Sequence, residues 1–108
     1  MSFVKSNQKF KYYEKEVSKD YFIIEENIIF AGTHIILDLW NCSFSNNIVF
    51  LKKIIKEAAN LSRANILHMH MHRFGKEQGI SGVAVLAESH ISVHTWPERN
   101  YMAFDMFM

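Results

Sequence analysis

The residues whose types could do chemistry gather between positions 88 and 98 of this sequence. Glu88, Ser89 and His90 follow one another directly, and His94 and Glu98 come a few residues later. A serine hydroxyl becomes a nucleophile when a base takes its proton, and imidazole suits this task because its unperturbed pKa is about 6.5. An apolar segment leads into this group and an alternating segment leads out of it. We therefore expect the hydroxyl, the two imidazoles and the two carboxylates to crowd around one bend of the chain.

These residue types alone leave several interpretations open. Ser89 could be an ordinary turn residue, Glu88 a solvated carboxylate and His94 a hydrogen-bonded histidine within a strand. Ser89, His94 and Asp105 also have the residue types of a hydrolase triad. Against a triad, Ser89 lacks the Gly-x-Ser-x-Gly turn that exposes such a nucleophile, and the sequence indicates no oxyanion hole.

Three further histidines, His68, His70 and His72, alternate along the sequence, so a strand would place them on one face. Neutral imidazoles bind zinc, and Cα atoms two residues apart in a strand lie about 6.5–7 Å from each other, so two rings could converge on one ion. A third ring would require the strand to bend, and a carboxylate or water would have to complete the coordination. We interpret the row as a polar strand face and predict no metal site.

Length and composition narrow the class of protein. The 108 residues suffice for one small domain with little room for a cavity, so we expect the chain to oligomerise. A hydrophobic content of 49% and a net charge of +1 indicate a folded protein without the basic surface that nucleic acids require. Residues 1–19 lack the apolar segment of a signal peptide, and no apolar run approaches the roughly 20 residues of a membrane span. We expect a cytoplasmic protein with no membrane partner. The single cysteine, Cys42, excludes an internal disulfide.

Alternation of apolar and polar residues predicts several strands. Residues 32–40 place Ile35, Leu37 and Leu39 on one face, which should meet the core. Asparagine and glutamates between two apolar runs indicate a short hairpin or two strand fragments before that strand. The predicted strands are residues 21–24 and 28–30 in the hairpin, 32–40, 65–74, 83–87, an alternating segment that ends before Pro97, and 101–108.

One amphipathic helix is predicted between the first long strand and the rest. Apolar residues recur at three- and four-residue steps from Ile48 to Leu61, which indicates a helix of about 14 residues after turn and N-cap candidates at 43–47. The order of strand, helix and sequential strands favours an α+β class, with an antiparallel sheet covered by a helix on one face as a two-layer sandwich. We assign residues 1–30 to an N-terminal extension, whose aromatics are Phe10, Tyr12 and Tyr13, and residues 31–108 to the domain.

Two segments closely resemble the bacterial and archaeal S-adenosylmethionine decarboxylases, which are self-processing enzymes with a pyruvoyl prosthetic group. They are residues 79–83 (Gly-Ile-Ser-Gly-Val) and 87–98 (Ala-Glu-Ser-His-Ile-Ser-Val-His-Thr-Trp-Pro-Glu). The resemblance extends to Gly-Thr-His at 32–34, His-Arg-Phe at 72–74 and residues 101–107, and covers roughly positions 31–108. The match of about a dozen residues around Ser89 is specific, whereas Gly-Thr-His alone would be weak.

The resemblance implies that the chain cleaves itself between Glu88 and Ser89. The Ser89 hydroxyl would attack the Glu88 carbonyl to give an ester, and loss of the Ser89 α-proton would then release Glu88. Hydrolysis would leave a pyruvoyl group at Ser89 and two chains, residues 1–88 and 89–108. In the family, the histidine matching His94 takes the α-proton and the serine matching Ser81 assists the acyl shift. The ketone would form a Schiff base with the substrate α-amine and accept the electrons released with carbon dioxide.

The resemblance also implies the substrate. The residue matching Phe74 stacks on adenine and the one matching Glu98 contacts the substrate, so we expect decarboxylation of S-adenosylmethionine for polyamine (spermidine) synthesis. Because the chain is small, we expect a homodimer paired into four layers, with sheets or helices facing each other across the pair. Two alternatives remain: a pyruvoyl-dependent decarboxylase of ornithine or arginine, for which His68 and His70 would line a changed pocket, and a non-catalytic homologue or partner of a decarboxylase.

The sequence departs from the family pattern after residue 107. In the family this segment continues into a threonine, a cysteine and a glycine, and the cysteine donates a proton during decarboxylation. The present sequence ends at Met108, and Cys42 lies too early to be aligned with that cysteine. The departure predicts a longer natural chain, a different proton donor, or a protein that processes itself and turns over poorly.

Overall fold

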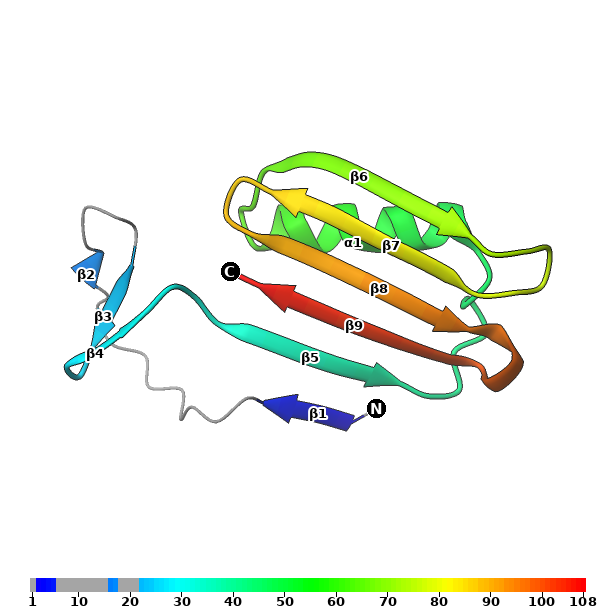
Figure 1. The fold of residues 1–108 in the computed structure, drawn as a ribbon, viewed down its shortest axis with the longest axis horizontal. Helices are drawn as coiled ribbons and strands as arrows, with labels where there is room; N and C mark the ends of the chain where they lie inside the picture. The colour runs from blue at the N-terminus through cyan, green and yellow to red at the C-terminus, as the bar shows by residue number, and fades with distance from the viewer. Residues whose placement is uncertain (1, 6–15, 18–21) are drawn as a thin grey trace.

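A computed structural model describes residues 2–5, 16–17 and 22–108, and it consists of one helix on one face of an antiparallel sheet (Figure 1). The six strands of the main sheet lie in the order β1-β5-β9-β8-β7-β6. This arrangement confirms the predicted α+β class and the two layers. The main sheet comprises β1 (Ser2–Lys5), β5 (His34–Leu39), β6 (Ile66–Arg73), β7 (Ile80–Leu86), β8 (His90–Trp96) and β9 (Tyr101–Phe107).

The helix α1 (Ile48–Leu61) has the bounds and length that its apolar periodicity predicts. Its N-cap is Asn47, whose side chain accepts a hydrogen bond from the Phe50 backbone N–H at 3.0 Å. Leu51, Ile55 and Ala59 recur every four residues and are buried against the sheet. The described residues contain no helix that is both long and apolar enough to cross a membrane.

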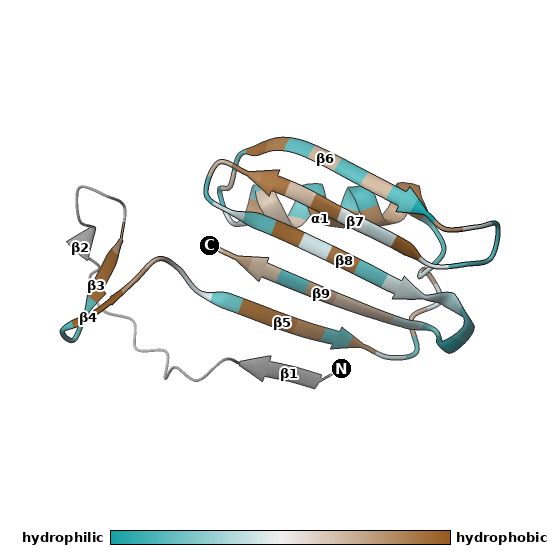
Figure 2. Cartoon of the chain, in the orientation of Figure 1, coloured by the Kyte–Doolittle hydropathy of each residue, from teal (hydrophilic) through white to brown (hydrophobic). Residues whose placement is uncertain are grey.

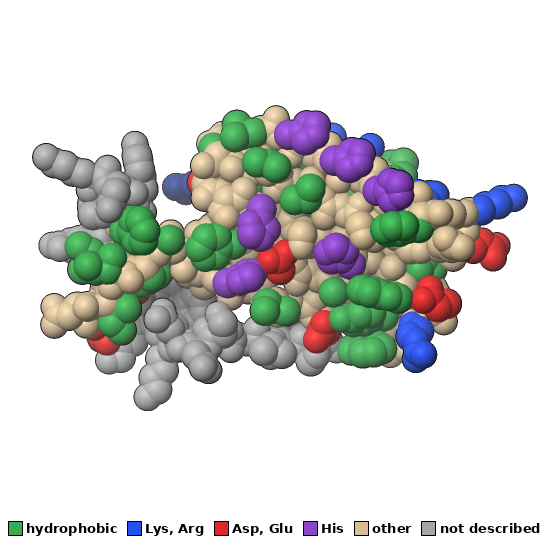
Figure 3. Space-filling view, in the orientation of Figure 1, with side chains coloured by type: hydrophobic (Ala, Val, Ile, Leu, Met, Phe, Trp, Pro, Cys, Tyr) green, Lys and Arg blue, Asp and Glu red, His purple; other side chains and the backbone are tan. Residues whose placement is uncertain are grey.

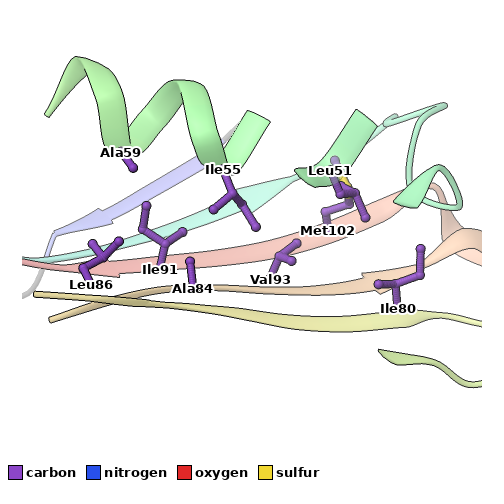
Figure 4. Close-up of a cluster of buried hydrophobic side chains, with 9 residues drawn as sticks. All are labelled: Leu51, Ile55, Ala59, Ile80, Ala84, Leu86, Ile91, Val93 and Met102. Atoms are coloured by element: carbon purple, nitrogen blue, oxygen red, sulfur yellow. The ribbon is translucent and has the colours of Figure 1, made fainter. Parts of the chain in front are cut away.

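The hydrophobic core fills the space between α1 and the strands β7, β8 and β9 (Figure 4). Ile35, which the alternation assigned to the core, is instead 40% exposed, whereas Leu39 on the same strand packs against the core. β7 begins at Ile80, before the predicted residues 83–87, so Ser81 lies within a strand. The core side chains are Leu51, Ile55, Ala59, Ile80, Ala84, Leu86, Ile91, Val93 and Met102.

The opposite face of the sheet, which we call the open face, is free of the helix and carries the polar side chains. Alternating hydrophilic and hydrophobic bands along β6, β8 and β9 show this division of each strand into two faces (Figure 2). The strand register places all six histidines on the open face, where they gather in Figure 3. They are His34 on β5, His68, His70 and His72 on β6, and His90 and His94 on β8.

A second, three-stranded sheet is formed by strands that lie between β1 and β5 in the sequence. It comprises β2 (Glu16–Val17), β3 (Ile23–Glu25) and β4 (Ile28–Phe30), and the last two form the predicted hairpin. Glu26 and Asn27 both have positive φ, at 49° and 66°, as a tight two-residue hairpin turn requires. β1 pairs with β5 in the main sheet. The aromatics predicted to fray or to lie on the domain, Phe10, Tyr12 and Tyr13, are outside the described residues.

Candidate active site

Four of the residues predicted to form the site line one cleft on the chain. They are Phe74 at the end of β6, Ser81 on β7, His94 on β8, and Glu98 in the short 3-10 helix η1 (Pro97–Arg99). The cleft has a volume of about 570 Å³. Its remaining wall is formed by Glu77, Gln78, Gly79, Thr95 and Trp96.

Ser81 and His94 lie directly opposite each other in the β7–β8 pairing, and their side chains meet on the open face. The Ser81 hydroxyl oxygen lies 2.9 Å from His94 Nδ1, so the two side chains share a hydrogen bond. Behind them, the buried Thr95 hydroxyl accepts a hydrogen bond from the Ile80 backbone N–H at 2.8 Å. The pair therefore sits on a part of the sheet that holds its geometry in place.

Aromatic rings form the rim of the cleft. Phe74 is 60% exposed and meets the His72 ring edge-on, with centroids 4.7 Å apart. Trp96 stacks on Tyr101 at 5.3 Å between centroids. The Tyr101 hydroxyl donates to Asp38 at 2.6 Å, and this bond, with a smaller contribution from burial, raises the pKa of Tyr101. An exposed aromatic such as Phe74 could stack on a planar ligand.

Ser89 lies at the other end of the β7–β8 hairpin, in a turn that is held in place by Asn65. The Glu88 carboxylate accepts from the Asn65 backbone N–H at 3.0 Å and from its side-chain amide at 3.1 Å. The first of these bonds is the main reason that the pKa of Glu88 is lowered. The Ala87 backbone N–H donates to the Asn65 carbonyl at 2.9 Å, and Leu86 N–H donates to the Ser89 carbonyl at 2.8 Å. The backbone is thus anchored on both sides of the Glu88–Ser89 bond, at which the sequence analysis predicted cleavage.

The predicted crowding of reactive groups around one bend is wrong within a single chain. His94 follows Ser89 by five residues along an extended strand, which corresponds to roughly 17 Å. Ser81 is paired with His94 and lies equally far away. The structure therefore divides the predicted site into two halves, with Glu88 and Ser89 at one end of the hairpin and the cleft residues at the other.

A further cluster beside Ser89 was missed as a unit by the sequence analysis. Asp105 on β9 lies between His34 and His90, whose Nε2 atoms are 2.5 Å and 3.1 Å from its Oδ2 atom. The Ser92 hydroxyl donates to Oδ1 of the same carboxylate. Alternation along each strand could have shown that His34, His90 and Asp105 share one face of the sheet. Only the pairing of β5 and β8 with β9 shows that the three strands are neighbours.

The family model described as S-adenosylmethionine decarboxylase matches residues 33–108. The chain belongs to the S-adenosylmethionine decarboxylase family. It is 45% identical over 78 residues to the S-adenosylmethionine decarboxylase proenzyme of Methanococcus aeolicus, a match that covers 70% of this chain and 66% of the relative. It is 46% identical over 79 residues to the proenzyme of Prochlorococcus marinus, covering 71% of this chain and 62% of the relative.

The fold of this S-adenosylmethionine decarboxylase family member also matches a solved structure. The crystal structure of the adenosylmethionine decarboxylase from Aquifex aeolicus superposes with a TM-score of 0.64 and 28% sequence identity. The match covers 71% of this chain and 64% of that one. The chain therefore spans just under two thirds of the length of these relatives.

His34, His90 and Asp105 are also the residues of this family member that could hold a metal ion. One ligand atom from each lies within 4.8 Å of the others, and two imidazoles with a carboxylate are a ligand set that zinc accepts. Among the described residues, no such group of three includes His68, His70 or His72. The row of histidines on β6 stays interpreted as a polar strand face.

We expect Asp105→Asn to lower stability at neutral pH and to have less effect in acid. Partial burial alone would raise the pKa of Asp105, but hydrogen bonds from Ser92, His34 and His90 outweigh it and lower the pKa from 3.8 to about 2. A lowered pKa means that the carboxylate stabilises the fold above pH 3.8 and that this contribution is lost as the pH falls towards 2. We expect Asp105→Asn to lower the free energy of unfolding at neutral pH by about 1 kcal/mol, because water partly screens the carboxylate.

The difference in the free energy of unfolding is measured by urea denaturation of Asp105→Asn and of the native chain, at a series of pH values from neutral to acid. Glu57→Gln on the exposed face of α1 is the matched control that removes one charge elsewhere. A difference between Asp105→Asn and the native chain that stays constant down to pH 2 would contradict the assignment.

Proposed function

We propose that the chain is the precursor of a pyruvoyl-dependent S-adenosylmethionine decarboxylase that cleaves its own Glu88–Ser89 bond and acts in cytoplasmic polyamine (spermidine) synthesis. The observation that carries this proposal is the Ser81–His94 hydrogen bond inside a cleft that Phe74 and Glu98 also line. Family membership supports it, because the relatives bear the name of proenzymes. We propose residues 31–108 as the decarboxylase domain and residues 1–30 as its extension.

The separation of Ser89 from His94 leads us to propose a homodimer in which the two halves of the site come from different chains. A two-fold axis that pairs the open faces, with the strands of the two sheets antiparallel across the interface, would set Ser89 of one chain against Ser81 and His94 of the other. His94 would then take the α-proton of the partner's Ser89, and Ser81 would assist the acyl shift. The helices would lie outside, which gives four layers. Apolar side chains exposed on the open face support this pairing: Trp40, Val83, Val85 and Trp96.

The cleft supports a cationic substrate with a flat group. Its volume of about 570 Å³ is within the range of small-molecule sites. Phe74 would stack on the adenine, and Glu98 would attract the sulfonium or the α-amine. The pyruvoyl group, once formed from Ser89, supplies the electron sink for loss of carbon dioxide. The side chains of the cleft bind the substrate and hold it in a single orientation.

A second substrate class, ornithine or arginine, is favoured by one observation. Two carboxylates, Glu77 and Glu98, line the cleft, and a basic amino acid would benefit from both. Carbon dioxide release measured with S-adenosylmethionine, ornithine and arginine separates the candidates. Release from none of the three, by a chain that stays uncleaved, would favour a non-catalytic homologue or partner.

We expect Phe74→Ala to raise KM for S-adenosylmethionine about fivefold, because an aromatic stacking contact contributes on the order of 1 kcal/mol. The effect on kcat should be smaller, since the ring binds the substrate in the ground state and in the transition state alike. Phe74→Tyr is the matched control and should keep the native KM. Equal KM values for Phe74→Ala and the native chain would argue against adenine stacking and for a smaller substrate.

A further inference from the structure

A chain of hydrogen bonds leads away from the Ser89 hydroxyl across two neighbouring strands. The Ser89 oxygen lies 3.4 Å from His90 Nδ1, and His90 Nε2 lies 3.1 Å from Asp105 Oδ2. His34 Nε2 lies 2.5 Å from the same carboxylate oxygen, and Ser92 donates to the other oxygen. The first contact is long, as contacts between a nucleophile and its base often are before the reacting geometry is reached.

The carboxylate at the centre of this chain decides which nitrogen of His90 carries the proton. An ionised carboxylate only accepts hydrogen bonds, so His90 must present its Nε2–H to Asp105. In neutral imidazole the other nitrogen, Nδ1, then has a free lone pair, and this atom faces the Ser89 hydroxyl. His90 is thus oriented to accept the hydroxyl proton, in the way that a buried carboxylate orients the histidine of a serine hydrolase.

The strands hold this geometry without help from the turn itself. His90 is the first residue of β8, and its partner in the register on β9 is Phe107, with Asp105 two residues before it on the same face. His34 approaches the carboxylate from β5 on the far side of β9. The base and the residue that orients it therefore both sit on the sheet, and His90 directly follows Ser89 in the sequence.

We propose that His90 is the base that takes the proton from the Ser89 hydroxyl in the first step of self-cleavage, and that Asp105 is the positioning residue that fixes its tautomer. This inference rests on the function proposed above. The Ser89 oxygen bonds to the Glu88 carbonyl carbon, and its proton passes to His90 Nδ1. As the bond from that carbon to the Ser89 nitrogen breaks, His90 returns the proton to the leaving nitrogen, which becomes a free amine beside an ester.

The two histidines on β8 would then serve two different protons. His90 handles the hydroxyl proton of its own chain, while His94 of the opposite chain removes the α-proton in the later step. Loss of His90 should block the chain as an amide, whereas loss of His94 should block it as an ester. Hydroxylamine distinguishes the two, because it cleaves an ester at neutral pH and leaves an amide intact.

Cleavage rates measured by intact mass test the proposal on the freshly expressed full chain. We expect His90→Gln and Asp105→Asn to slow cleavage at least about hundredfold, the lower bound for loss of a general base. His90→Gln and Asp105→Asn should stay whole in hydroxylamine, because they keep the amide. His94→Ala should be cleaved by hydroxylamine between residues 88 and 89, because it stops at the ester. Glu57→Gln, on the exposed face of α1 and away from the open face, is the control and should cleave at the native rate.

Chemical rescue separates the loss of a base from damage to the fold. Added imidazole should restore cleavage of His90→Ala, because the cavity left by the ring admits a free base, and should not restore cleavage of Asp105→Asn. Asp105→Glu, which keeps the carboxylate, should recover part of the rate. Failure of imidazole to rescue a His90→Ala chain with native circular dichroism would overturn the assignment of His90 as the base.

Two further outcomes count against the proposal. If the native chain and His90→Gln cleave at the same rate, the role of His90 is wrong and the proposed function stands. If the native chain never cleaves, both the role of His90 and the proposed function are wrong. Cleavage that stops when a chelator is added would show that His34, His90 and Asp105 act through a metal ion, which would also overturn the proton transfer.

Discussion

Ser89→Ala should leave the polypeptide whole and without decarboxylase activity. The native chain should separate into fragments of residues 1–88 and 89–108, and the smaller fragment should begin with a ketone that borohydride reduces. Alanine has no hydroxyl to attack the Glu88 carbonyl, so neither the ester nor the pyruvoyl group can form. Intact mass and carbon dioxide release measure the two losses, and both should be complete.

Ser43→Ala, an exposed serine before α1, is the matched control and should cleave and turn over like the native chain. Full activity in Ser89→Ala would show that the pyruvoyl mechanism is wrong. Cleavage in Ser89→Ala at the same bond would show that another nucleophile acts at the turn.

A mixture of Ser89→Ala and His94→Ala chains should cleave although neither variant cleaves alone. In a mixed dimer of the proposed kind, the His94→Ala chain supplies an intact Ser89 and the Ser89→Ala chain supplies an intact Ser81–His94 pair. The distance of roughly 17 Å along β8 prevents one chain from supplying both to the same site. Only the His94→Ala chain should be cut, because only that chain has the hydroxyl, and the fragment masses identify it.

The control for this experiment replaces the Ser89→Ala chain with a chain that carries both substitutions. Such a mixture contains no intact His94 and should stay whole. Native mass spectrometry, which resolves the mass difference between the two variants, establishes that mixed dimers are present. Dimers that stay uncleaved in the first mixture, or a native protein that is monomeric, would argue against a site shared between chains.

The local parts of the fold were predictable because they depend on residues close together in the sequence. The helix α1 follows from apolar residues spaced three and four apart, and Asn47 marks its start. The β3–β4 hairpin follows from the residues of its turn. The alternation of His68, His70 and His72 predicted that they share one face of β6, and the structure confirms this by placing all three on the open face. The exposure of Ile35 was not predictable, because it depends on how far the helix covers the sheet.

The sequence predicted which residues line the cleft better than it predicted where the site residues lie relative to one another. Phe74, Ser81, His94 and Glu98 do line one cleft, although the two strands β7 and β8 separate Phe74 from Glu98 in the sequence. Ser89 lies away from them, because a strand carries each successive residue farther along its axis. Asn65 was missed altogether, since its hold on Glu88 spans 23 residues and no local pattern marks it.

By itself the sequence determined the family motif, the helix and the strands from β3 onwards, and it indicated Ser89 as the candidate nucleophile, because each of these depends on residue types at short spacing. Only the tertiary structure decided which groups meet. Strand pairing joins Ser81 to His94 across 13 residues and His34 to Asp105 across 71, and it keeps Ser89 and His94 apart although five residues separate them. Distance along an extended chain grows with every residue, whereas neighbours across a sheet lie about 5 Å apart whatever their separation in sequence. That difference is the reason why His90, with Asp105 behind it, is the imidazole beside the Ser89 hydroxyl.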